Sequence, residues 1–188
     1  MIRVRTALVL AFGASLIGGH RGQAQTRVGS DSATRLTRAG RDFVYGTVEG
    51  LAFAGVAQLR TDPPQWGKGW PGYEKRAASN LGEFYIQEAV TEGLAAAMNR
   101  PLDYKRCKCR DFGDRFAAAM RGAVTDQMPD GSHPLAIPRF VGAFAGSFAQ
   151  AGWSPTTGTN SKTRIALGNG LESIAIGALI NLYHETRR

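Results

Sequence analysis

Apolar residues recur along most of the chain at spacings of three, four, seven and eight positions, the period of a helix with one buried face. The first segment with this period extends from Asp31 or Ser32, either of which can cap a helix, to about Arg60. Pro63 and Pro64 come next and end it, because proline cannot continue a helix. The same period predicts further helices over about residues 73–99, 111–124, 139–153 and 163–185.

These segments predict an all-α fold, a bundle of four to five helices, because the sequence lacks runs with the alternating pattern of a strand. Small residues one helical turn apart predict packing faces of glycine and alanine in several of the helices. In water such faces receive bulky side chains, and in a membrane they let two backbones approach. We expect the following residues to lie at helix contacts: Gly46, Gly50, Gly142, Gly146 and Gly177.

The fourth predicted helix divides its residues between two faces. Phe140, Phe144 and Phe148 fall on one side of a helical projection, and Gly142 and Gly146 fall on the other. We expect the phenylalanine ridge to lie in the core. The glycine groove is expected to receive another helix of the bundle.

The beginning of the chain has the pattern of a signal peptide. Arg3 and Arg5 precede an apolar run from Thr6 to Gly19, and small residues follow at Gly22 and Ala24. The apolar run is shorter than the ~20 residues that span a bilayer. We therefore expect residues 1–24 to be removed and the protein to be exported to the periplasm or the cell envelope. The remainder, residues 25–188, is expected to fold as a single helical domain.

The charge of the chain bears on its partners. Removal of residues 1–24, which hold three arginines and no acids, lowers the formal net charge from +8 to +5. The basic residues are scattered apart from those at 105–110, whereas a nucleic-acid-binding protein concentrates them on a stripe, so we expect no nucleic-acid partner. An anionic membrane surface or an envelope protein suits this charge, and self-association as a homo-oligomer is a further option.

Polar residues within the predicted helices argue against helices that span a membrane. Glu49, Asn169, Glu172 and Asn181 interrupt the predicted helices, so none of them offers an unbroken span of ~20 apolar residues. We therefore favour a soluble or peripherally attached bundle over an intramembrane one.

A loop rich in glycine and tryptophan precedes the second predicted helix, and its pattern is W-G-K-G-x-x-G-Y-x-x-R over residues 66–76. This pattern resembles a family of uncharacterised exported bacterial α-helical proteins in which a Trp/Gly-rich loop is followed by Gly-Tyr-x-x-Arg. The similarity covers roughly residues 65–155, and this chain departs from it by an inserted Cys-Lys-Cys. The resemblance implies export and a helical domain, and it implies no activity.

The same loop is a candidate binding or interfacial element, because tryptophan suits half-hydrated positions beside cationic side chains. The alternative is a loop that folds over the end of the bundle. The candidate binding residues are Trp66, Lys68, Trp70, Tyr73 and Arg76.

Two glutamates are the only candidates for catalysis. Glu88 and Glu92 lie one turn apart on a helix face that also carries aromatic residues, where carboxylates are unfavourable unless they are paired. They could share a proton or bind a metal, although the Glu-x-x-His motif of carboxylate bundles is missing, and we expect no metal and no cofactor. The favoured alternative is neutralisation by arginine, for which the candidates are Arg76, Arg115, Arg121 and Arg139.

Cys107 and Cys109 form a C-x-C pair. Outside the cytosol a disulfide is the usual fate of two thiols, although a bridge across one residue is sterically awkward. A structural, a redox and a metal-binding role all remain open, and metal binding is disfavoured because no second Cys/His pair with ligand spacing exists.

Together these features predict an exported, envelope-associated helical protein with a structural or interaction role at or near a membrane. A carboxylate- or metal-dependent enzyme centred on Glu88 and Glu92 is the alternative.

Overall fold

The computed structural model describes residues 32–155 and 159–187. The predicted signal peptide lies outside the described residues. The elements are α2 (Ser32–Arg60), η1 (Pro64–Trp66), α3 (Gly69–Ala97), α4 (Phe112–Val124), α5 (Ile137–Trp153) and α6 (Thr159–Thr186). Within the described ranges the fold is all-α, with five α-helices packed against one another and no strand, which confirms the predicted fold class.

Two helices begin four residues earlier than the apolar pattern predicts. Helix α3 starts at Gly69, so that Pro71 occupies its first turn, where a backbone N–H has no partner within the helix and proline is tolerated. Gly67 and Gly69, on either side of the helix cap, adopt φ values of 74° and 76°, which glycine accepts without strain. Helix α6 starts at Thr159, in a stretch whose Ser and Thr residues suggested a loop.

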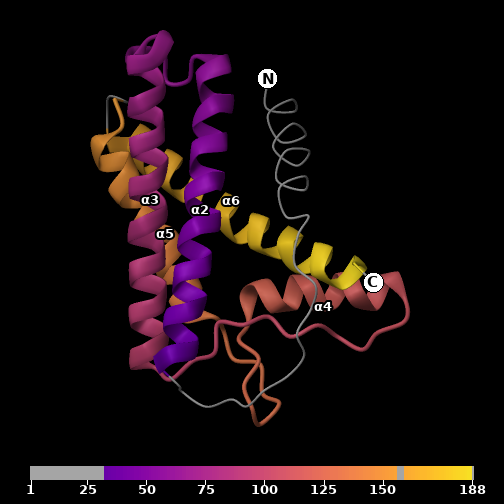
Figure 1. Ribbon diagram of the computed structural model, residues 1–188. Coiled ribbons are helices and arrows are strands. Elements are labelled where there is room, and N and C mark those ends of the chain that lie inside the picture. The colour runs from indigo at the N-terminus through magenta and orange to yellow at the C-terminus, as the bar shows by residue number, and fades with distance from the viewer. Residues whose placement is uncertain (1–31, 156–158, 188) are drawn as a thin grey trace. The chain divides into compact units, whose positions relative to one another are not determined.

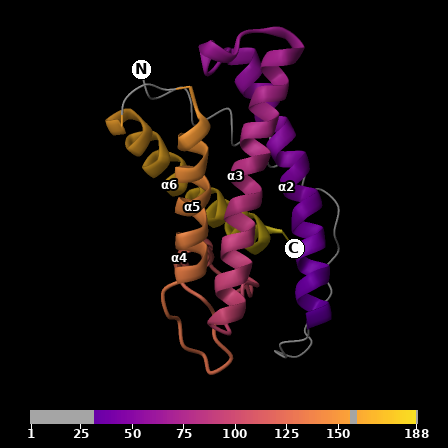
Figure 2. The ribbon, with the colours of Figure 1, turned by 90° about the vertical axis from the view of Figure 1, so that its left-hand side faces the viewer.

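The helices contact one another in the order α2, α3, α5, α6, α4. Helices α2 and α3 form a hairpin in which they lie side by side, and α5 lies on another side of α3 (Figures 1 and 2). Helix α6 crosses α5 with its first part and contacts α4 with its later part (Figure 1). Helices α2 and α4 therefore each have one main helical neighbour, and much of their surface is left without a protein contact.

The interior is made of small and polar side chains. In the described ranges the buried apolar side chains are alanines, apart from Pro138. The largest fully buried side chains include Arg76, Asp126 and Ser147. Large apolar side chains are half-buried or exposed instead, and Leu59 is the extreme case with 88% exposure. This distribution is the reverse of the usual one in a water-soluble domain.

The predicted glycine groove of α5 receives α3. A Cβ atom added to Gly146 would lie 2.7 Å from the backbone oxygen of Glu83 and 3.0 Å from Cβ of Gln87. A Cβ atom added to Gly142 would overlap the side chain of Thr91. The two backbones thus approach more closely than any side chain on this face of α5 would permit.

A second close contact joins α2 to α3. Gly46 lies against the ring of Phe84, and a Cβ atom added to Gly50 would lie 3.0 Å from Cδ2 of Leu81. Gly177 differs from these positions, because an added Cβ there would meet nothing within 4 Å. The small residue at Gly177 therefore does not serve a helix contact in this structure.

The phenylalanine ridge of α5 only partly enters the core, which corrects the expectation from the sequence. Phe144 packs closely on Gly170 of α6. Phe148 is 47% exposed, and it lines an apolar surface hollow together with Phe140 and Val141. The reason is the position of α6, which covers one part of the ridge and leaves the rest without a neighbour.

Candidate functional site

Exposed apolar side chains occur on each of the five helices. They form a stripe along α2, where successive members are three, four or eight residues apart, and they continue on α5 and α6. We refer to the following set as the outer apolar residues: Val44, Val48, Leu51, Leu59, Val141, Phe148, Leu167, Leu171 and Leu179. A contiguous exposed apolar patch usually marks contact with a membrane or a partner.

The contacts of α3 with α5 and α6 contain hydrogen bonds between polar side chains. Ser147, which is fully buried, donates to Glu83 at 2.8 Å, and Ser173 donates to Gln87 at 3.1 Å. Burial raises the pKa of Glu83, the hydrogen bond from Ser147 lowers it, and the nearby charge of Glu172 raises it further. We refer to these five residues as the polar seam.

Glu92 forms the ion pair that the sequence suggested, but with a different arginine. Arg38 of α2 donates to both carboxylate oxygens of Glu92, at 2.9 and 3.0 Å, and to Asp103 at 3.2 Å. Arg38 lies 54 residues from Glu92 in the sequence, so neither spacing nor helical periodicity could have identified it.

The arginines that the sequence suggested have other partners. Arg76 and Arg115 donate to backbone carbonyls, and Arg139 binds the carbonyls of Gly122 and Leu102. Within the described residues, none of the four suggested arginines, Arg121 included, forms a hydrogen bond or ion pair with Glu88 or Glu92.

Glu88 is half-buried beside this ion pair. Burial raises the pKa of its carboxyl to about 7, the negative charges of Asp42 and Glu92 raise it as well, and Arg38 opposes them. In the described part of the chain, no three His, Cys, Asp or Glu residues are grouped so that they could hold a metal ion. Chemically, the site offers an ion pair and one carboxyl that can exchange a proton near neutral pH.

The Trp/Gly-rich loop is held by Arg76, which is 1% exposed. Its guanidinium donates to the backbone oxygens of Asp62, Pro63 and Gly67 at 2.8 to 3.0 Å, and to the side chain of Gln58 at 2.7 Å. These bonds fix the turn between α2 and α3. Arg76 is therefore unavailable to an external ligand, and the structure places it among the residues that stabilise the loop.

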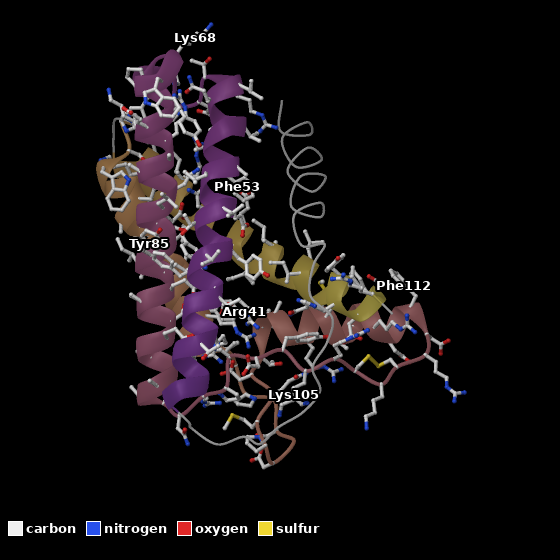
Figure 3. All side chains as sticks on the ribbon, in the orientation of Figure 1. Arg41, Phe53, Lys68, Tyr85, Lys105 and Phe112 are labelled. Carbon is white, nitrogen blue, oxygen red and sulfur yellow. A yellow bond between two sulfur atoms is a disulfide. The ribbon has the colours of Figure 1, made fainter. Side chains whose placement is uncertain are left out.

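The other candidate binding residues differ in their exposure. Trp66 is half-buried with the Arg76 guanidinium 6.0 Å from its ring centroid, and Tyr73 donates to the carbonyl of Leu51 at 3.3 Å. Lys68 and Trp70 are exposed, and Figure 3 shows Lys68 at the tip of the α2–α3 hairpin. Only these last two side chains are placed to meet a partner.

Cys107 and Cys109 are joined by a disulfide, one of the outcomes that the sequence left open. It lies in the segment before α4, where Figure 3 shows the bond between the two sulfurs. Glu185 of α6 accepts hydrogen bonds from the backbone N–H of Cys107 and from the hydroxyl of Tyr104 in this segment, and sequence analysis identified neither contact. They escaped notice because Glu185 lies 78 residues away from Cys107 and carries no motif.

One helix within the described residues, α6 over Ser161–Thr186, is long and apolar enough to cross a membrane by length and composition. Only 22% of its most apolar window is buried, whereas the core helix of a water-soluble protein is mostly buried. Asn169, Glu172 and Asn181, the polar residues on which the sequence-based expectation rested, lie within this helix.

No protein-family model, curated protein or solved structure matches the chain.

Proposed function

We propose that the protein is an exported, non-catalytic helical module that binds to a membrane surface, with the outer apolar residues in contact with lipid. One observation carries this proposal: within the described residues the fully buried side chains are small or polar, whereas the large apolar ones are half-buried or exposed. Leaving a large apolar side chain in water forgoes about 1.5–3 kcal/mol of burial. Nine such positions are more than a folded domain usually leaves without a partner.

Lipid suits these residues better than a single protein partner does. The outer apolar residues belong to three helices, and further exposed aromatic residues lie on α4, where Phe112 is 63% exposed and Phe116 is 45% exposed. A bilayer can cover such a dispersed set because lipid adapts to the shape of the surface, while a protein interface forms one compact patch.

Charge and helix composition support the same partner. Lys68 and Trp70 are exposed together at the tip of the α2–α3 hairpin, and tryptophan and lysine are the residues that anchor proteins at the bilayer interface. The net positive charge favours anionic lipid, at ~1 kcal/mol for each basic residue near the surface. Helix α6 adds an apolar surface of membrane length.

Flotation of the purified protein with vesicles of phosphatidylcholine and phosphatidylglycerol tests the proposal. We expect the wild-type protein to float with the vesicles. A variant in which Val44, Val48 and Leu51 are all serine should bind the vesicles at least about a hundredfold more weakly and float correspondingly less, since each substitution loses roughly 1–2 kcal/mol of apolar burial.

The matched control carries serine at Ala78, Ala96 and Ala97, which are exposed on α3 and are not outer apolar residues. It should float as well as wild type. Equal flotation of the two triple-serine variants would contradict lipid contact through α2, and a wild-type protein that stays at the bottom of the gradient would contradict the proposal altogether.

The alternative is a carboxylate-dependent enzyme, and one observation favours it. Glu88 has a pKa of about 7, near the pH at which a general acid or base is most effective. We rank this function second because Glu92 is held in the ion pair with Arg38. In addition, neither glutamate lines the surface hollow on α5 or the cavity beside Cys107.

A further inference from the structure

The segment between α3 and α4 carries a disulfide that contacts a buried carboxylate. Cys107 and Cys109 are both half-buried, with Cα atoms 5.2 Å apart. Glu185, near the end of α6, is only 3% exposed. Its Oε1 accepts hydrogen bonds from the Cys107 backbone N–H and from the Tyr104 hydroxyl, each at 2.7 Å. Its Oε2 lies 3.4 Å from Sγ of Cys107.

The contact between Oε2 of Glu185 and Sγ of Cys107 is a hydrogen bond only when Cys107 is reduced. A disulfide sulfur carries no proton, so in the oxidised protein this oxygen of a buried carboxylate faces an atom that cannot donate to it. A buried acceptor without a donor is unfavourable. After reduction, the Cys107 thiol donates to Oε2 along the same contact. Glu185 therefore shifts the redox equilibrium of Cys107 and Cys109 toward the reduced form, relative to an exposed C-x-C segment.

The surroundings of the pair are strongly basic. Lys105, Arg106, Lys108 and Arg110 flank the two cysteines in the sequence. A cavity of about 350 Å³ opens beside Cys107, and its lining includes the following basic side chains: Lys105, Arg106, Arg121 and His133. Figure 3 shows Lys105 on this segment. This positive charge around the pair attracts a thiol that carries negative charge.

We propose that Cys107 and Cys109 form a redox-active pair that exchanges with an anionic dithiol, such as a peptide with two cysteines and acidic residues. This activity is independent of membrane binding. The disulfide is within reach of such a substrate because both cysteines are half-exposed.

The exchange is a two-electron transfer in two steps. In the first, a substrate thiol attacks Sγ of Cys109, the Cys107–Cys109 bond breaks, and the proton of the attacking thiol is transferred to the Cys107 sulfur, which then donates to Glu185. In the second, the other substrate thiol attacks the substrate sulfur of the mixed disulfide, and Cys109 leaves as a thiol. The substrate dithiol is oxidised to a disulfide and the protein disulfide is reduced to a dithiol.

The redox equilibrium of the purified protein with reduced and oxidised glutathione, read by thiol alkylation and intact mass, tests the role of Glu185. In Glu185→Gln the acceptor has lost its charge, so the ratio of dithiol to disulfide should fall about tenfold. Tyr104→Phe is the matched control, because it removes one hydrogen bond to Oε1 and leaves the Oε2 contact in place. Its ratio should stay within about twofold of wild type.

Charge selectivity is tested on the wild-type protein, so it does not depend on a folded variant. We expect mercaptoacetate, an anionic thiol, to reduce the disulfide at least about tenfold faster than cysteamine, a cationic thiol, when both rates are corrected for the thiolate fraction. Replacement of Lys105 and Arg121 by serine should remove most of this preference.

Three results would overturn the proposal. The first is two free thiols in the air-oxidised protein, and the second is a disulfide that resists millimolar glutathione. The third is a Glu185→Gln variant that keeps its helical circular dichroism and has the same redox equilibrium as wild type.

Discussion

At the residue scale, one deeply buried charge, that of Arg76, has a structural role. Arg76 is 1% exposed and is surrounded by carbonyl oxygens of the turn between α2 and α3. Arginine suits this position because its planar group offers five donors in a fixed geometry, whereas lysine offers three donors at one point. The W-G-K-G-x-x-G-Y-x-x-R pattern thus contains the arginine whose hydrogen bonds hold the loop in place, which explains the close spacing of glycines and arginine.

We predict that Arg76→Ala lowers the free energy of unfolding by about 3 kcal/mol or more, because it leaves several buried carbonyl oxygens without donors. Arg76→Lys should have an intermediate effect. Urea denaturation followed by circular dichroism measures both. Lys75→Ala, at the exposed neighbouring position, is the control and should change the free energy by less than about 0.5 kcal/mol. Near-equal stability of Arg76→Ala and wild type would show that the hydrogen bonds of Arg76 do not stabilise the loop.

Glu88 makes the stability of the folded protein depend on pH. Its pKa is about 7 in the folded protein and has its ordinary value of 4.5 when exposed, so folding opposes its ionisation. Below pH 4.5 the carboxyl is protonated in both states and has no effect. As the pH rises from 4.5 to about 7, this group progressively destabilises the folded protein, and the full penalty is present above pH 7.

We predict that Glu88→Gln is more stable than wild type by about 2–3 kcal/mol near pH 8, because the neutral amide avoids this penalty. The difference should vanish near pH 4.5. Thermal melts at the two pH values measure it. Glu92→Gln breaks the ion pair with Arg38 and should be less stable than wild type at pH 8, so the two variants shift in opposite directions. A Glu88→Gln variant that is less stable at pH 8 would contradict the raised pKa.

At the element scale, the glycine groove of α5 brings its backbone against that of α3. The sequence predicted the glycine groove correctly, because Gly142 and Gly146 both leave room for the α3 backbone. It did not predict which helix fills the groove, since periodicity describes one helix at a time. It also did not predict that the opposite face of α5 is only partly covered, because that depends on the crossing of α6.

We predict that Gly146→Ala lowers the melting temperature, although alanine in a helix is normally favoured over glycine by ~1 kcal/mol. The new Cβ would lie 2.7 Å from the Glu83 carbonyl oxygen, so the helices must separate, which costs about 1–3 kcal/mol. Gly93→Ala is the matched control. Gly93 lies within α3, is exposed and has nothing within 4 Å of an added Cβ, so this variant should melt higher than wild type. An increase for both variants would mean that α3 does not occupy the groove.

Helix boundaries and side-chain partners were predicted to different degrees for physical reasons. The helix ends set by proline, such as the end of α2 before Pro63, were predicted to within one residue, because proline acts locally. The starts of α3 and α6 did not, because polar and glycine residues can occupy a first turn. The partners Arg38 and Glu185 each join residues more than 50 positions apart, and the residue types alone do not determine such pairings.

At the scale of the whole chain, the order in which the described helices pack explains why the large apolar residues are outside. Each helix contacts one or two others, and α3 uses its inner faces for α2 and α5. Close contacts of this kind use glycine, alanine and serine, so the bulky residues of α2, α5 and α6 are left on the faces without a neighbour. Helix packing based on small and polar residues is common where lipid, rather than water, surrounds the protein.

Quenching of tryptophan fluorescence by vesicles with brominated acyl chains tests lipid contact most directly, because bromine quenches only at short range. Trp70 and Trp153 are exposed, by 69% and 44%, whereas Trp66 is half-buried beside Arg76. We predict strong quenching of the wild-type protein and weak quenching of a variant in which Trp70 and Trp153 are phenylalanine. Unquenched wild-type emission in vesicles that bind the protein would contradict contact between its apolar surface and lipid.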